Sequence, residues 1–86
     1  MKDELIEDIA YLKRSTHRIA VLSTLSTDKL KRPSDISKEK NMSLSDVSRA
    51  LKGLKDNGFV ECLNEKAKQG RLYQITKKGK KSLEYL

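Results

Sequence analysis

The chain has 86 residues, a formal net charge of +7 at pH 7 and a sequence isoelectric point of about 9.6. We expect a chain of this length to form one small domain over residues 1–86, and its single cysteine excludes an intramolecular disulfide. Even the longest apolar runs, such as residues 19–22, are far too short to span a bilayer. These features argue against a membrane protein, a disulfide scaffold and a zinc domain, and they predict a cytoplasmic location.

The charge is distributed unevenly along the chain. Residues 2–8 are mostly acidic, whereas the lysines and arginines between positions 66 and 81 have no acid among them. A cationic end of this kind predicts a polyanion partner, because each neutralised phosphate releases counterions. A basic composition alone also fits high solubility or an anionic membrane surface, so the motifs must distinguish these readings.

Residues 3–14 are predicted to form an N-terminal helix, with acids in its first turn and bases in its last. Leu5, Ile9 and Leu12 fall on one stripe, which Ile6 and Ala10 widen. The stripe is broader than one face of a tiny domain needs. It therefore predicts either a subunit contact or simple burial within the monomer.

A second helical segment is predicted over residues 17–25, either continuous with the first or kinked at Ser15, which can cap it. His17 is the only histidine, and without a second ligand or a nucleophile beside it we expect a surface or capping role. Residues 26–32 are polar and aperiodic and are expected to form a loop. This part of the chain carries no catalytic or metal-binding pattern.

Pro33 fits the first position of a short helix that Asn41 can end in the left-handed conformation. The next helix, up to residue 57, begins at Ser43, where Ser43 and Asp46 form a capping-box-like start, and Asn57-Gly58 provides a left-handed stop. Its predicted apolar stripe comprises Leu44, Val47, Leu51 and Leu54. Two helices joined by so short a connection predict a helix-turn-helix over residues 33–57.

The opposite face of the second of these helices is short, hydroxylated and basic. It carries Ser45, Ser48, Arg49, Lys52 and Lys55. Arginine can bond guanine edges bidentately, and serine and lysine can reach bases or phosphates, so this face suits a DNA groove. An ordinary amphipathic helix with a solvated face would show the same pattern.

A hairpin is predicted over residues 59–75, with strands at 59–63 and 71–75 and a basic loop at 64–70. Tyr73 and Ile75 should share one face of the second strand. Lys66 and Lys68 at the tip, and Arg71 at the return, can reach phosphates or a minor groove. Cys62 lies inside a strand, where we expect a small buried apolar group rather than a redox sensor.

Thr76 is expected to cap a last helix over residues 77–86, which Gly79 weakens by up to about 1 kcal/mol relative to alanine. The basic first half of this helix could contact DNA or be solvated. Leu83 and Leu86 look suited to packing on another apolar face, such as that of the N-terminal helix, within or between subunits.

The chain resembles the small archaeal winged helix-turn-helix regulators of the ArsR/MarR-like group. The segments that carry the resemblance are HRIAVL (17–22), RPSDI (32–36), SLSDVSRAL (43–51), GFVECLN (58–64) and GRLYQITKKG (70–79). The resemblance implies an α+β, mainly α fold, with a two-stranded wing and flanking N- and C-terminal helices. It also implies a homodimer on pseudo-palindromic DNA, with residues 43–56 as recognition helix and 64–70 as wing. Metal-sensing members carry Cys/His clusters that this chain lacks.

The sequence thus predicts a nucleoid-associated homodimeric transcription regulator that binds double-stranded DNA sequence-specifically. No glycine-rich phosphate loop or Cys/His dyad supports an enzyme, and no cofactor or effector ligand is indicated.

The predicted base-reading residues are Ser45, Ser48, Arg49 and Lys52. The predicted DNA-backbone residues are Ser34, Ser43, Lys55, Lys66, Lys68, Arg71, Lys77 and Lys78. The predicted dimer contacts are Leu5, Ile6, Ile9, Leu12, Leu83 and Leu86. Two alternatives stay open: a winged-helix module that contacts protein or RNA, and a chromatin-like protein that coats DNA non-specifically.

Overall fold

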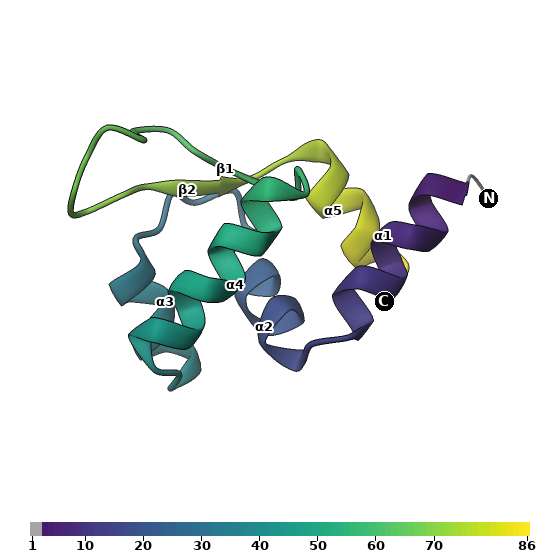
Figure 1. Ribbon diagram of the computed structural model, residues 1–86, viewed down its shortest axis with the longest axis horizontal. Helices are drawn as coiled ribbons and strands as arrows, with labels where there is room; N and C mark the ends of the chain where they lie inside the picture. Colours follow the sequence, from purple (N-terminus) through teal and green to yellow (C-terminus); the bar gives the residue numbers. More distant parts are fainter. Residues whose placement is uncertain (1–2) are drawn as a thin grey trace.

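A computed structural model describes residues 3–86, which form five helices and one two-stranded antiparallel sheet (Figure 1). The elements are α1 (Asp3–Lys13), α2 (Thr16–Thr24), α3 (Pro33–Lys40), α4 (Leu44–Asp56), β1 (Val60–Cys62), β2 (Tyr73–Ile75) and α5 (Lys77–Glu84). This mainly helical order with one hairpin is the predicted one. Figure 1 shows the β1–β2 loop at one end of the molecule, with α1 and both chain ends toward the other.

The first two helices are separate, which decides between the two readings of the N-terminal segment. Ser15 has an extended backbone (φ −145°, ψ 120°), and its hydroxyl accepts a hydrogen bond from the backbone N–H of Arg18 at 3.4 Å. The hydroxyl satisfies a donor that the first turn of α2 leaves unpaired. The chain therefore turns at Ser15, and α1 packs beside α2 instead of extending it.

The two helices of the predicted helix-turn-helix begin and end close to the expected positions. Pro33 starts α3, and Asn41 ends it with a left-handed backbone (φ 52°, ψ 47°). The Ser43 hydroxyl accepts from the backbone N–H of Asp46 at 3.1 Å and so caps α4. At the other end of α4, Asn57 keeps a negative φ of −99°, and Gly58 alone turns left-handed with φ 81°.

The hairpin pairs β1 with β2 in antiparallel register, with Val60 opposite Ile75 and Cys62 opposite Tyr73. Both strands are shorter than predicted, although Tyr73 and Ile75 do share the buried face. Lys31, in the segment expected to be only a loop, forms an isolated bridge with Tyr73, through N–H···O bonds of 3.2 and 2.9 Å. This pairing joins residues far apart in sequence, so local polarity did not predict it.

The core lies between α2, α3, α4 and the sheet, and two predicted assignments change there. Leu12 is 0% exposed and packs in this core, so it cannot be the dimer contact that was predicted. Leu44 was predicted to lie in the buried stripe of α4 but is 53% exposed, whereas Val47, Leu51 and Leu54 are buried. More than half of the Leu44 side chain is therefore open to solvent at the start of α4.

The last helix is shorter than predicted and ends at Glu84. The Thr76 hydroxyl caps it by accepting from the backbone N–H of Gly79 at 3.1 Å. α5 packs beside α1 near the two chain ends. No helix within residues 3–86 is long and apolar enough to cross a membrane.

Candidate nucleic-acid interface

The outer face of α4 is exposed along its length. Ser45, Ser48, Arg49 and Lys52 all lie on it, opposite the buried Val47, Leu51 and Leu54. Apolar residues recur at spacings of three and four along this helix. They therefore pack on one side of it and leave the other side to solvent. The structure thus brings the four predicted base-reading residues onto one accessible surface.

A groove of about 730 Å³ lies between α4, the start of α3 and the β1–β2 loop. From here on we call that whole loop, residues 63–72, the wing. We refer to this cavity as the α4–wing groove. Its cationic lining comes from segments far apart in sequence and comprises Arg32, Lys52, Lys55, Lys68 and Arg71. Ser34 and Ser48 add hydroxyls, and Asp56 adds the single acid among its lining residues. Because cations outnumber acids in this lining, the cavity attracts a polyanion.

Arg49 lies on the other side of the exposed face, away from the wing. It lines a smaller hollow of about 190 Å³ together with residues at the start of α2, including His17 and Arg18. The Arg49 guanidinium approaches the Asp46 carboxylate at 3.7 Å, and its side chain is 79% exposed. An exposed ion pair of that length leaves most of the guanidinium donors available.

The wing is held together by a side chain that the sequence reading did not single out. The Asn64 amide oxygen accepts from the backbone N–H of Leu72 at 2.7 Å, and its amide nitrogen donates to the Gly70 carbonyl at 3.2 Å. Arg71 donates through Nε to the Ala67 carbonyl at 2.9 Å, which leaves its terminal nitrogens outside that bond. Lys66 and Lys68 are exposed on this ordered loop, which Figure 1 shows projecting from the body.

Lys55 was predicted to contact the DNA backbone, but its ammonium is engaged in an ion pair within the protein. Its ammonium lies 2.7 Å from the carboxylate of Glu65 in the wing. This hydrogen bond raises the pKa of Lys55 above 10.5 and lowers the pKa of Glu65 below 4.5. The pair joins α4 to the wing, so Lys55 positions the wing beside the exposed face of α4.

Lys78, which was predicted to contact the DNA backbone, is engaged within the protein. Its ammonium donates to the Asn57 carbonyl at 2.7 Å, approaches Asp8 at 3.3 Å and lies 5.0 Å from the centre of the Phe59 ring. These partners hold α5 to α1 and to the end of α4. Lys77, by contrast, is exposed, and its predicted role is unchanged.

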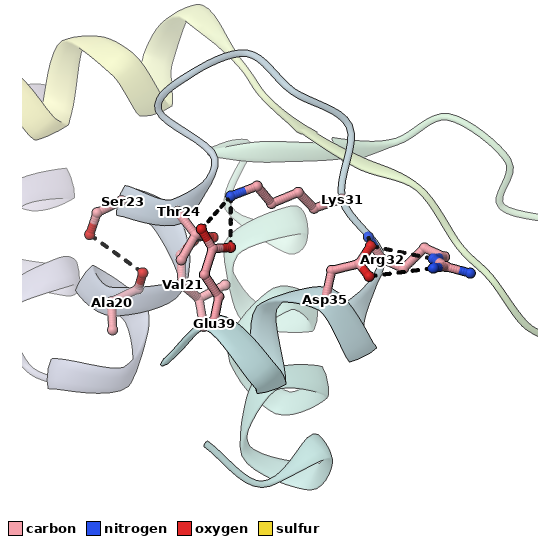
Figure 2. A network of polar contacts seen from close by, with 8 residues as sticks. All are labelled: Ala20, Val21, Ser23, Thr24, Lys31, Arg32, Asp35 and Glu39. Carbon is pink, nitrogen blue, oxygen red and sulfur yellow. Dashed lines mark hydrogen bonds and ion pairs between the residues drawn. The ribbon is translucent and has the colours of Figure 1, made fainter. Parts of the chain in front are cut away.

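The segment that leads into α3 is fixed by polar contacts (Figure 2). The Lys31 ammonium bonds both carboxylate oxygens of Glu39, at 3.0 and 2.8 Å. Asp35 accepts from the backbone N–H of Arg32 at 3.1 Å and from its guanidinium at 3.3 Å, and these bonds lower the pKa of Asp35 below 3.8.

The same segment supplies two of the groove residues. Ser34 is exposed in the first turn of α3, and Arg32 lies directly before that turn; both line the α4–wing groove. Arg32 was absent from the predicted site. The sequence feature that could have identified Arg32 as a site residue is its position immediately before Pro33, the first residue of α3.

Within residues 3–86, no three His, Cys, Asp or Glu side chains gather closely enough to hold a metal ion. His17 is exposed, and Cys62 is half-buried with its thiol 3.6 Å from the Asn64 amide oxygen. The polar groups that do converge are cations and hydroxyls around the α4–wing groove. This arrangement suits the recognition of phosphate oxygens and base edges.

Solved structures with the same fold include a mutant MarR from E. coli in complex with operator DNA and a MarR family transcriptional regulator from Silicibacter pomeroyi. The first is 26% identical, with a TM-score of 0.73, and the match covers 95% of this chain and 59% of that one. The second is 29% identical, with a TM-score of 0.73, and the match covers 92% and 54%. The chain therefore spans little more than half the length of these regulators.

A homodimeric winged helix-turn-helix DNA-binding domain from Mycobacterium bovis gives a TM-score of 0.71 over 99% of this chain and 82% of that one. At 18% identity this likeness is one of fold alone. These matches confirm the predicted winged helix-turn-helix fold.

No protein of curated function matches the sequence. The family model described as the HVO_A0261 N-terminal domain matches residues 6–85. Because that match covers nearly the whole chain, the chain belongs to the HVO_A0261 N-terminal domain family, with the winged helix-turn-helix fold of MarR- and ArsR-type regulators.

Proposed function

We propose that the chain is a transcription regulator that binds double-stranded DNA sequence-specifically as a homodimer. The exposed face of α4 lies in the major groove and contacts base edges, and the wing contacts the flanking backbone or the minor groove. Arg49 is the main base-reading residue in this proposal, supported by Ser45 and Ser48. Lys68 and Arg71 contact phosphates.

The observation that carries the proposal is the convergence of cations in the α4–wing groove. Arg32, Lys52 and Lys68 come from three separate segments, yet they line one cavity beside the exposed face of α4. Arg32 pairs with Asp35, but Lys52 and Lys68 have no ion-pair partner within residues 3–86, so their charges remain available to phosphates. The likeness to a MarR that was solved on operator DNA supports the same role.

Non-specific coating of DNA has less support than it had from the sequence. The unbroken cationic stretch suggested it, but two of those cations are engaged within the fold. Lys78 pairs with Asp8 at 3.3 Å, and Lys80 pairs with Asp28 at 2.6 Å. These two ion pairs hold α5 in place, so the two lysines present less charge to DNA.

The test is selection of bound sites from a pool of randomised duplexes, followed by mobility shifts from about 50 to 200 mM salt. We expect an enriched pseudo-palindrome with half-sites about 10 bp apart or a multiple of that spacing, and binding that weakens steeply with salt. Equal affinity for every duplex would favour the coating protein. Absence of salt-sensitive duplex binding below micromolar protein would favour the protein- or RNA-contacting module.

A further inference from the structure

Leu44 is an apolar side chain on a polar, cationic surface. It is the first residue of α4 and is 53% exposed, whereas the other leucines of that helix, Leu51 and Leu54, are buried. Single exposed leucines are common on protein surfaces, so exposure alone indicates nothing. What distinguishes Leu44 is its position relative to the α4–wing groove.

Leu44 lines that groove one helical turn before Ser48, on the same edge of α4. The N-terminal residues of a recognition helix are the ones that contact base edges when the helix enters the major groove. Leu44 thus occupies the turn of α4 that enters first. The cations that line the same groove provide the charge complementarity that holds a duplex there.

The chemistry of leucine restricts what it can recognise in that position. Its side chain has no donor or acceptor, so it cannot bond a phosphate or the polar edge of a base. The major groove offers one distinctive apolar group, the C5-methyl of thymine, which marks a T·A pair. An exposed leucine next to that methyl would bury apolar surface of both partners.

We propose that Leu44 packs against the C5-methyl group of a thymine and sets a preference for T·A at one position of each half-site. This inference rests on the proposed function, because it assigns a specificity-determining contact to the same interface. It assigns Leu44 a role distinct from those of Arg49 and Ser48, which recognise polar base edges.

The experiment replaces each thymine of the selected site, one position at a time, with deoxyuridine, which lacks only the methyl group. We expect wild-type affinity to fall about fourfold at one thymine per half-site, since burying a methyl-sized group contributes about 0.8 kcal/mol. Leu44→Ala should bind the thymine site about fourfold more weakly than wild type and show no further loss with deoxyuridine. This comparison isolates the side chain–methyl contact.

Leu30→Ala is the matched control, because Leu30 is another exposed leucine, at 44%, and is not among the residues that line the groove. It should keep the wild-type response to deoxyuridine. The DNA arm leaves the protein unchanged, so it tests the contact even if Leu44→Ala fails to fold.

Two results would overturn the inference in different ways. Sequence-selective binding with equal affinity for thymine and deoxyuridine at every position would remove the methyl contact and leave the proposed function intact. Failure to enrich any duplex sequence would remove the proposed function, and the contact with it.

Discussion

Arg49 is held less firmly than Lys55, the other cation of α4 that forms an ion pair. Its ion pair with Asp46 spans 3.7 Å, whereas Lys55 and Glu65 lie 2.7 Å apart. An exposed, weakly paired guanidinium can reorient toward a guanine edge at little cost. This freedom is what a base-reading residue requires.

Arg49→Ala should therefore weaken binding to the selected site by about 1–3 kcal/mol and relax the sequence preference. Binding to random duplex should change much less, because phosphate contacts remain. Titrations of both duplexes by fluorescence anisotropy measure the two effects. An equal loss on the selected and the random duplex would contradict base reading by Arg49.

Gly79 has a packing role that helix propensity does not convey. A Cβ built on Gly79 would overlap the backbone carbonyl of Phe59 and would lie 2.7 Å from Cγ1 of Ile75. The missing side chain allows α5 to approach the end of β2 this closely. The close contact with the sheet requires a glycine here, and this glycine lowers the helix propensity of α5.

Gly79→Ala should therefore destabilise the fold by about 1–2 kcal/mol, because overpacking outweighs a gain in helix propensity of about 1 kcal/mol. Gly53→Ala in α4 is the comparison, since the added Cβ would meet the hydroxyl end of the Tyr11 side chain and no backbone atom. That variant should destabilise the fold less than Gly79→Ala. Urea unfolding measures both, and equal destabilisation would argue against the close-approach explanation.

At the scale of elements, the wing is fixed by its own hydrogen bonds and by one ion pair to α4. Asn64 closes the loop internally, and Glu65 reaches Lys55 at 2.7 Å. Lys55 is therefore paired within the protein, whereas Lys68 has no ion-pair partner within residues 3–86. The two lysines should differ in how they affect DNA binding.

Glu65→Gln should release Lys55 toward the phosphates and make the slope of log K against log salt steeper by about 0.9. Lys55→Gln should leave the slope nearly unchanged, whereas Lys68→Gln should reduce it by about 0.9. Affinities measured across a salt series give these slopes. A reduction of about 0.9 for Lys55→Gln would restore its predicted role at the backbone.

The same pair predicts a pH window for wing docking. Glu65 has a pKa below its ordinary 4.5. The ion pair therefore contributes its full stabilisation of the docked wing above pH 4.5, and this stabilisation is lost as pH falls through the lowered pKa. Lys55 has a pKa above its ordinary 10.5, so the contribution is full below pH 10.5 and is lost as pH rises through the raised value.

An NMR titration of the Glu65 carboxylate should therefore show a midpoint below 4.5 that returns toward 4.5 in Lys55→Gln. The shift has its main cause in the hydrogen bond from Lys55, with a smaller contribution from Arg71. Lys68→Gln should leave the midpoint in place and serves as the control. An unchanged midpoint in Lys55→Gln would show that the ion pair does not form in solution.

At the scale of the whole molecule, apolar residues of α1 and of the C-terminal segment remain exposed at the end opposite the wing (Figure 1). Ile6 is 52% exposed, and Tyr85 and Leu86 are exposed as well. The remaining predicted dimer contacts, Leu5, Ile9 and Leu83, are half-buried. A second copy packed on this end would bury these residues and leave the α4–wing groove open to DNA.

Light scattering should therefore find a dimer at micromolar concentration and a shift toward monomer for Ile6→Glu, which places a charge in the apolar contact. Leu30→Glu introduces the same charge at an exposed leucine in the α2–α3 connection and should stay dimeric. A wild-type chain that is monomeric at micromolar concentration would contradict this interface.

The sequence by itself determined the order of the elements and most of their ends. Pro33, Ser43 and Thr76 act on backbone groups within three residues of themselves, so their effect can be seen locally. The periodicity of α4 placed its exposed and buried faces for the same reason, except in its first turn.

Only the tertiary structure decided what distant segments do to one another. It buried Leu12, exposed Leu44, bridged Lys31 to Tyr73 and engaged Lys78 with Asp8. Each outcome depends on which surface another segment covers or which charge it brings near, and no local pattern carries that information. The cationic groove that supports the proposed function is such a product, since its lining is assembled from segments that only the fold brings together.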